Sequence, residues 1–145
     1  MHINEVLAGK ARQDVVTITP DSTVRDLLEL LALHNVGAVI VSRDGSAVNG
    51  IVSERDVVRR LNEDDSVLLA PVSAIMTTEV HTCDGSEPVL ELMKLMTERR
   101  VRHVPVVRDG VLAGVVSIGD VVKSRISELE FERDQLDSYV QSSQT

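Results

Sequence analysis

The chain carries the same unit of sequence twice. GIVSERDVV at residues 50–58 and GVVSIGDVV at residues 114–122 share a glycine, two β-branched apolar residues, a serine, an aspartate and two valines in one order. VGAVIV at 36–41 and VRHVPV at 101–106 precede them. Self-similarity at a fixed spacing is the mark of a repeat architecture. The 145 residues therefore form one compact domain, or two half-size units that share a core.

Each copy predicts the same order of secondary structure. Apolar residues with i, i+3, i+4, i+7 spacing over 24–31 and 89–96 predict one amphipathic helix per copy. Asp21-Ser22 and Ser86-Glu87-Pro88 provide the predicted N-cap and first-turn residues. An Asp-Gly turn between β-branched runs predicts a hairpin in each copy. The resulting order is strand, helix, strand, turn, strand, helix, an α/β (α+β) fold, over residues 15–61 and 80–126.

The composition limits which residue types can form the core and which classes of partner the chain can bind. The only Phe and Tyr are Phe131 and Tyr139, and there is no Trp, so the core must be aliphatic. A net charge of −8 opposes non-specific attraction to nucleic acid or to an anionic membrane. The single Cys83 is most simply a small apolar residue and fits a reducing compartment. The opening MHINEVLAGKAR lacks the apolar run of a signal peptide, and we expect a cytoplasmic protein.

The segments around the two copies differ in character. Residues 63–79 begin acidic and become apolar, which predicts a linker packed on the domain. Ile126, Leu129, Leu136 and Val140 have heptad-like spacing in the tail, interrupted by Arg133. This tail either caps its own domain or packs against a second subunit. The predicted organisation is an N-terminal segment with a short helix (1–13), repeat 1 (14–62), a linker (63–79), repeat 2 (80–126) and a C-terminal helical tail (127–145).

The Ser-x-x-Asp in each repeated phrase has two physical interpretations. Ser53 and Asp56, like Ser117 and Asp120, have the spacing of a capping box at a helix start. The same helix start presents free amides and a positive dipole end to a phosphate. A carboxylate there can also accept hydrogen bonds from the two hydroxyls of a ribose. From the residues alone both interpretations stay open.

The whole set of motifs resembles a tandem pair of CBS (cystathionine-β-synthase-type) domains. The resemblance rests on VVTITPDSTVRDLLELLALHNVGAVIVSRDG…GIVSERDVV, on the bridging VSAIMTTEV, and on VHTCDGSEPVLELMKLMTERRVRHVPVVRDGVLAGVVSIGDVV. The ending is similar to stand-alone bacterial CBS-pair proteins without an attached enzyme. The resemblance implies two βαββα units about a pseudo-two-fold axis, a homodimer, and clefts that bind adenosine-containing ligands such as AMP, ADP, ATP, NAD or S-adenosylmethionine.

The resemblance also assigns roles to residues. Asp56 and Asp120 are expected to bind ribose, and Ser53 and Ser117 to bind phosphate or cap the helix. From the residues themselves, the cluster RRVRH at 99–103 is either a solvated helix end whose cations complement the dipole, or places Arg102 or His103 beside a ligand phosphate at the Asp120 site. In the second case the Asp120 site should be the tighter of the two. Pro105 suits an edge beside a ligand, and Gly119 allows close approach. The full predicted ligand-binding set is Thr17, Gly37, Ala38, Val39, Ser53, Arg55, Asp56, Thr78, Val80, Arg102, His103, Val104, Pro105, Ser117, Gly119 and Asp120.

Other classes of function find less support in the sequence. The four histidines show no metal-ligand spacing, and we predict neither a metal site nor catalytic residues. No required cofactor is expected, the adenine nucleotide being a regulatory ligand, and the regulated protein is not identified. Two alternatives stay open: a ligand-free dimeric scaffold in which the Ser-x-x-Asp phrases only cap helices, and a metal-binding CBS pair. The chain is too short for the catalytic barrel of CBS-bearing dehydrogenases.

Overall fold

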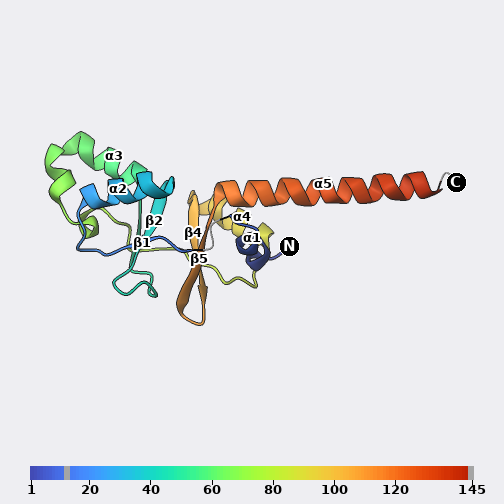
Figure 1. The fold of residues 1–145 in the computed structure, drawn as a ribbon, viewed down its shortest axis with the longest axis horizontal. Coiled ribbons are helices and arrows are strands. Elements are labelled where there is room, and N and C mark those ends of the chain that lie inside the picture. The colour runs from blue at the N-terminus through green and yellow to red at the C-terminus, as the bar shows by residue number, and fades with distance from the viewer. Residues whose placement is uncertain (12–13, 144–145) are drawn as a thin grey trace.

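The computed structural model describes residues 1–11 and 14–143 as two α/β halves joined side by side, with one long helix projecting away from them (Figure 1). The halves correspond to repeat 1 and repeat 2. The elements in chain order are α1 (Ile3–Ala8), β1 (Thr17–Ile18), α2 (Val24–His34), β2 (Ala38–Val41), β3 (Gly50–Ser53), α3 (Glu54–Glu63), η1 (Asp65–Leu69), η2 (Val72–Ala74), α4 (Val89–Arg99), β4 (His103–Arg108), β5 (Val111–Ser117) and α5 (Ile118–Ser143).

Repeat 1 has the predicted order of elements in full. Its three-stranded sheet runs β1-β2-β3, with β1 parallel and β3 antiparallel to β2. Helices α2 and α3 place Leu27, Leu31 and Val57 in one aliphatic core with Val39 and Val52 of the sheet. Each of these side chains is nearly or fully excluded from solvent, which supplies the main stabilising term of the half.

Repeat 2 repeats this plan with a shorter sheet. Strands β4 and β5 form an antiparallel hairpin, but the first strand expected near Val80 is reduced to a single parallel bridge between Cys83 and Val106. The chain turns away directly after that bridge because the Asp84 carboxylate accepts hydrogen bonds from the Ser86 amide and hydroxyl. The prediction of a first strand at Val80 was wrong in extent and in position.

The expected helix caps also need correction. The N-cap of α2 is Thr23, one residue beyond the predicted Asp21-Ser22, and its hydroxyl accepts from the Asp26 amide at 3.1 Å. The N-cap of α4 is Pro88, which makes no side-chain cap bond. The predicted Asp-Gly hairpin is confirmed as a two-residue turn in repeat 2, where Asp109 and Gly110 both have positive φ. In repeat 1 the same dipeptide lies in a longer loop.

Each half is completed by a segment that precedes the other half in the chain. Helix α1 precedes repeat 1, yet its Ile3 and Val6 lie in the core of repeat 2. Helix η2 precedes repeat 2, yet its Val72 and the following Ile75 lie in the core of repeat 1. The linker is therefore packed on the domain as expected, and the two cores do not follow the order of the chain.

The backbone bonds of these exchanged segments are equivalent in the two halves. The Ile3 amide donates to Glu87 O at 3.0 Å, and the Val72 amide donates to Ser22 O at 2.7 Å. Two glycines make room for the side chains that follow. A Cβ on Gly114 would lie 2.8 Å from Leu7 Cδ2, and one on Gly50 would lie 2.8 Å from Met76 Sδ. Glycine opens both repeated phrases because an exchanged segment crosses there.

Helix α5 continues without a break from the repeat into the tail. Its first turn packs on repeat 2 through Val121, whereas residues 129–143 are exposed along their whole length. Figure 1 shows this part extending far from both halves. The interpretation that the tail caps its own domain is therefore wrong for residues 129–143, although Ser124 and Glu128 at its start contact Met1. None of the helices in residues 1–11 and 14–143 combines the length and the apolar character needed to cross a membrane.

Cys83 behaves as the sequence suggested. It lies in the core of repeat 2. Burial, with smaller contributions from the negative charges of Glu87 and Asp84, raises the pKa of its thiol to about 12. Because the thiolate is the reactive form, this cysteine is chemically quiet at neutral pH.

Candidate functional site

Two clefts lie where the halves meet, and each contains one of the repeated Ser-x-x-Asp phrases. The Asp120 cleft, of about 520 Å³, includes Ser117 and Asp120. The Asp56 cleft, of about 330 Å³, includes Ser53 and Asp56. Both draw their walls from repeat 1 and from repeat 2. Gly37, Ala38 and His103 line both clefts.

In both clefts the serine and the aspartate form a capping box. Asp56 Oδ2 accepts from the Ser53 amide at 2.8 Å, and the Asp56 amide donates back to Ser53 Oγ at 3.4 Å. The corresponding distances for Asp120 and Ser117 are 2.9 and 3.1 Å. The capping interpretation is thus realised at both helix starts, and all these carboxylate bonds fall on Oδ2.

The first amide of each helix is also engaged. The Glu54 amide donates to Gly37 O at 3.0 Å, and the Ile118 amide donates to Arg102 O at 2.8 Å. With the first amide and the serine oxygen already occupied, each helix start has less capacity for a phosphate than an open helix N-terminus would have. Side-chain cations must therefore supply most of the attraction for an anionic ligand.

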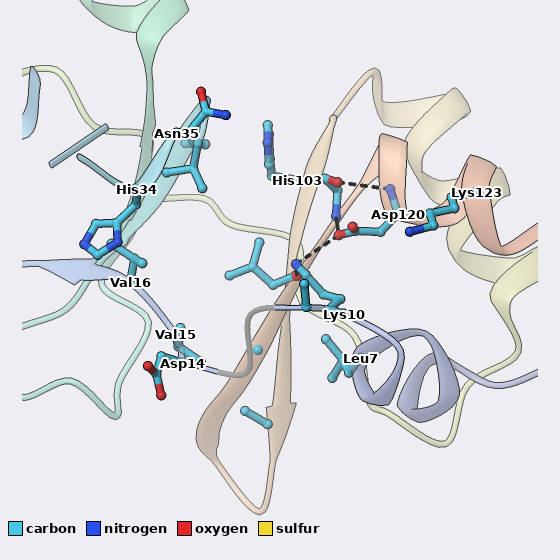
Figure 2. A pocket seen from close by; sticks show the side chains of 18 residues that line it. Leu7, Lys10, Asp14, Val15, Val16, His34, Asn35, His103, Asp120 and Lys123 are labelled. Atoms are coloured by element: carbon cyan, nitrogen blue, oxygen red, sulfur yellow. Dashed lines mark hydrogen bonds and ion pairs between the residues drawn. The ribbon is translucent and has the colours of Figure 1, made fainter. Parts of the chain in front are cut away.

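In the Asp120 cleft a cation from the N-terminal segment contacts the aspartate. Lys10 Nζ lies 3.0 Å from Asp120 Oδ2 and donates to Val115 O at 2.7 Å. Figure 2 shows Lys10, Asp120 and Lys123 on one wall of this cleft, and Val16, His34 and Asn35 on the facing wall. Burial raises the pKa of Asp120, but the Ser117 amide and the Lys10 ammonium outweigh it, so the net pKa lies below the ordinary value.

The Asp56 cleft has a different charge pattern. Arg55 and Arg59 of α3 line it together with Arg100 and Arg102, which follow α4. We expected Arg102 beside Asp120, and the structure places it in the other cleft. The reason is a crossed arrangement, in which the loop before β2 borders the Asp120 cleft and the equivalent loop before β4 borders the Asp56 cleft.

His103 lies between the two clefts and lines both. Burial lowers the pKa of His103; the negative Asp120 opposes this shift, while the positive Lys10 and Arg102 add to it. The imidazole is therefore neutral in the folded protein at pH 7, and it faces charged groups from both repeats and from the N-terminal segment.

This lowered pKa predicts a pH effect on stability. Below its ordinary pKa of 6.5 the unfolded chain binds a proton that folded His103 resists, so the free energy of unfolding should decrease as pH falls from 7 to 5. In His103→Gln this decrease should be smaller, as measured by urea denaturation at several pH values. His81→Gln, which removes an exposed imidazole, is the control. An unchanged pH slope in His103→Gln would contradict the prediction.

The remaining predicted site residues either line one of the clefts or line neither. Val80 lines the Asp56 cleft. Val104 and Pro105 are buried in β4, where Pro105 O accepts from the Cys83 amide at 3.0 Å. Pro105 is therefore an interior residue and not the edge residue that we expected. The predicted residues that line neither cleft are Thr17, Val39, Thr78, Val104, Pro105 and Gly119.

Sequence reasoning missed three cationic residues of the clefts. They are Lys10 and Lys123 in the Asp120 cleft, and Arg59 in the Asp56 cleft. Arg100 belongs to the cluster expected beside Asp120, and like Arg102 it lies in the Asp56 cleft instead. Arg59 had a usable signal, because it lies four residues after Arg55 and so on the same helix face. Lys10 had none, since it lies in a segment outside both repeats.

The described residues give no support to a metal site. No group of three or more His, Cys, Asp or Glu side chains within residues 1–11 and 14–143 is arranged to hold an ion. His34 lines the Asp120 cleft, His81 lines the Asp56 cleft and His103 lines both, but none of them belongs to such a group.

Comparison with known proteins agrees with this architecture. The CBS domain family model matches residues 4–63 and 72–127. The mitochondrial CBS domain-containing protein CBSX3 of Arabidopsis thaliana is 40% identical over 147 aligned residues, covering 96% of this chain and 71% of that protein. The crystal structure of a CBS-domain containing protein from Agrobacterium tumefaciens is 42% identical, with a TM-score of 0.79, covering 86% of this chain and 99% of that one.

A third relative has been solved with a ligand. The CBS domain protein of Pyrobaculum aerophilum complexed with AMP is 30% identical, with a TM-score of 0.73, covering 83% of this chain and 89% of that one. The repeated strand–helix phrase, the two clefts between the halves and these matches lead to one conclusion: the chain belongs to the CBS-domain family, as a tandem pair of CBS repeats.

Proposed function

We propose that this protein is a non-enzymatic regulatory module that binds adenosine-containing nucleotides in its two clefts. The observation that carries the proposal is the position of Asp56 and Asp120. Each is held at the start of a helix by its serine and lies in a cleft that both repeats build. A fixed carboxylate in such a cleft is a suitable acceptor for the vicinal hydroxyls of a ribose. The AMP complex of the Pyrobaculum relative supports this ligand class.

The walls of the clefts suit an adenine ring. Val15, Val16 and Val36 line the Asp120 cleft, and Ile51 and Val101 line the Asp56 cleft. Neither cleft is lined by Phe, Tyr or Trp within the described residues, so the ring would lie between aliphatic side chains. The contribution would come from apolar burial, without aromatic stacking.

Regulation would follow from the shared walls. A ligand that contacts both repeats binds best to one relative arrangement of them, and it shifts the population toward that arrangement by its differential affinity. We propose AMP, ADP, ATP or NAD as the ligand class, and an unidentified protein as the target.

The same proposal includes a homodimer. Large apolar side chains are exposed on helices of both repeats, among them Leu33, Val58 and Leu90. A second subunit that covers these side chains would remove their apolar surface from water. Native mass spectrometry reports the number of subunits and any retained nucleotide together.

A second candidate function is a ligand-free scaffold. The observation that favours it is that both Ser-x-x-Asp phrases already form complete capping boxes. In that case the aspartates would stabilise helices and bind nothing. A thermal-shift panel of adenosine compounds separates the two candidates, because a scaffold would show no shift with any compound.

The decisive test replaces each cleft aspartate by asparagine. Asp56→Asn and Asp120→Asn should each weaken nucleotide binding at least tenfold at their own cleft in isothermal titration calorimetry, because the charged acceptor for the ribose is lost. The matched control is Asp26→Asn. Asp26 forms the same capping box with Thr23 at the start of α2, but it lines neither cleft. Equal binding in all three variants would overturn the ribose assignment.

A further inference from the structure

The Asp56 cleft gathers four guanidinium groups on one rim. Arg55 and Arg59 are four residues apart on α3, and Arg100 and Arg102 come from the end of α4 and the residue before β4. All four line the same cavity, and all four are exposed. Two cations therefore come from repeat 1 and two from repeat 2, and all four line a single cleft.

None of these four arginines is ion-paired within residues 1–11 and 14–143. The Asp120 cleft offers a contrast, since its Lys10 Nζ lies 3.0 Å from Asp120 Oδ2. Carboxylates are available, because Glu54, Asp56 and Glu79 line the Asp56 cleft as well. The four guanidinium groups outnumber the three carboxylates of the same cleft, so the cleft keeps a net positive charge and attracts anions, in a chain with a net charge of −8.

The backbone of Arg100 is a second, independent observation. Arg100 is the C-cap of α4 and has a φ of 55°, in the left-handed region. The equivalent C-cap in repeat 1 is Asn35, with a φ of 52°. Asparagine and glycine are the residues that favour this conformation. Arginine at this point carries a guanidinium to the cleft rim against the local backbone preference.

The chemistry of the rim indicates the ligand. Guanidinium groups bind phosphate oxygens in bidentate fashion, and a row of four exceeds what one phosphate can engage. We propose that the Asp56 cleft selects an adenosine nucleotide with an oligophosphate chain, such as ADP or ATP, over AMP. The nucleoside lies in the cavity of about 330 Å³, and the phosphate chain crosses the rim between the two pairs of arginines.

The other cleft lacks this arrangement. Its cations are Lys10, which is committed to Asp120, and Lys123, and they share the cleft with Asp14. The Asp120 cleft therefore takes an adenosine ligand of lower charge. This inference rests on the proposed function, since it assumes that adenosine ligands occupy the clefts.

The experiment is isothermal titration calorimetry of the full chain with adenosine, AMP, ADP, ATP and inorganic tripolyphosphate in metal-free buffer. Affinity should rise at least tenfold from AMP to ATP, and the rise should shrink at high salt because the arginines are exposed. In Arg100→Gln/Arg102→Gln the rise should be lost while adenosine still binds. In Arg55→Gln/Arg59→Gln the rise in affinity should be lost as well. This second variant changes only α3, so its result does not depend on whether the first pair of substitutions disturbs the end of α4.

The control is Arg25→Gln/Arg43→Gln, two exposed arginines of repeat 1 that line neither cleft. It should keep the full rise. AMP and ATP of equal affinity, or a rise that survives both cleft variants, would overturn this inference and leave the proposed function intact. Absence of binding by every adenosine compound would overturn the proposed function itself, and this inference with it, whatever tripolyphosphate does.

Discussion

Replacing Ile3 by alanine should lower the free energy of unfolding by about 2–5 kcal/mol, the usual cost of truncating a large buried side chain. Ile3 is fully buried although it lies three residues from the N-terminus. It packs into the core of repeat 2 with Leu92, Met96 and Val116. Removing its outer carbons leaves a cavity between a helix at one end of the chain and a core built from the other end.

The measurement is urea denaturation followed by circular dichroism, because the chain has no Trp. Leu33→Ala is the control, since Leu33 is a similar aliphatic residue with 77% of its surface exposed. Hydrogen exchange should show that the loss of protection falls on β4 and β5 first, although the substitution precedes repeat 1 in the chain. A loss of stability no larger than that of Leu33→Ala would show that α1 is not part of the repeat 2 core.

Replacing Gly50 by alanine should cost about 1–3 kcal/mol of stability, as overpacking of a filled core does. The new Cβ would lie 2.8 Å from Met76 Sδ and 2.9 Å from the backbone oxygen of Thr77. The methionine can move, but Thr77 is held to Ile51 by two backbone hydrogen bonds of 2.9 Å each. The strand or the linker must therefore shift.

Gly114→Ala is the matched variant at the equivalent position. The three atoms nearest to its Cβ all belong to Leu7, whose closest carbon, Cδ2, is 2.8 Å away at the end of a flexible side chain. We expect a clearly smaller loss there than for Gly50→Ala in the same denaturation assay. A larger loss for Gly114→Ala would show that the fit of α1, and not that of the linker, is the tighter one.

Much of the fold follows from the sequence, because its patterns are local. The doubled phrase, the apolar spacing of α2 and α4 and the Ser-x-x-Asp helix starts each depend on residues within a few positions of one another. The exchange of α1 and η2 is not local. The only sign of it in the sequence is a common spacing of apolar residues, at Ile3, Val6 and Leu7 and at Val72, Ile75 and Met76. This spacing shows that the two segments are equivalent, but it does not show which core each one completes.

The clefts could be predicted only in part for the same reason. Ser53 and Asp56 follow from their phrase, but their cationic neighbours come from the other repeat. Proximity in sequence assigned Arg102 to the Asp120 cleft, whereas the crossed arrangement brings it to Asp56. Lys10 and Asp120 are separated by 110 positions in the chain, and no pattern within either repeat predicts that they pair.

Helix α5 connects the Asp120 cleft to a distant, exposed end of the molecule. Asp120 belongs to its first turn, and the same uninterrupted helix ends at Ser143. At 1.5 Å per residue its 26 residues span about 39 Å. Each degree by which the Asp120 turn tilts therefore moves the far end by about 0.7 Å. A rearrangement at the cleft too small to alter the packing of either half would therefore be magnified into a displacement at the far end of the helix.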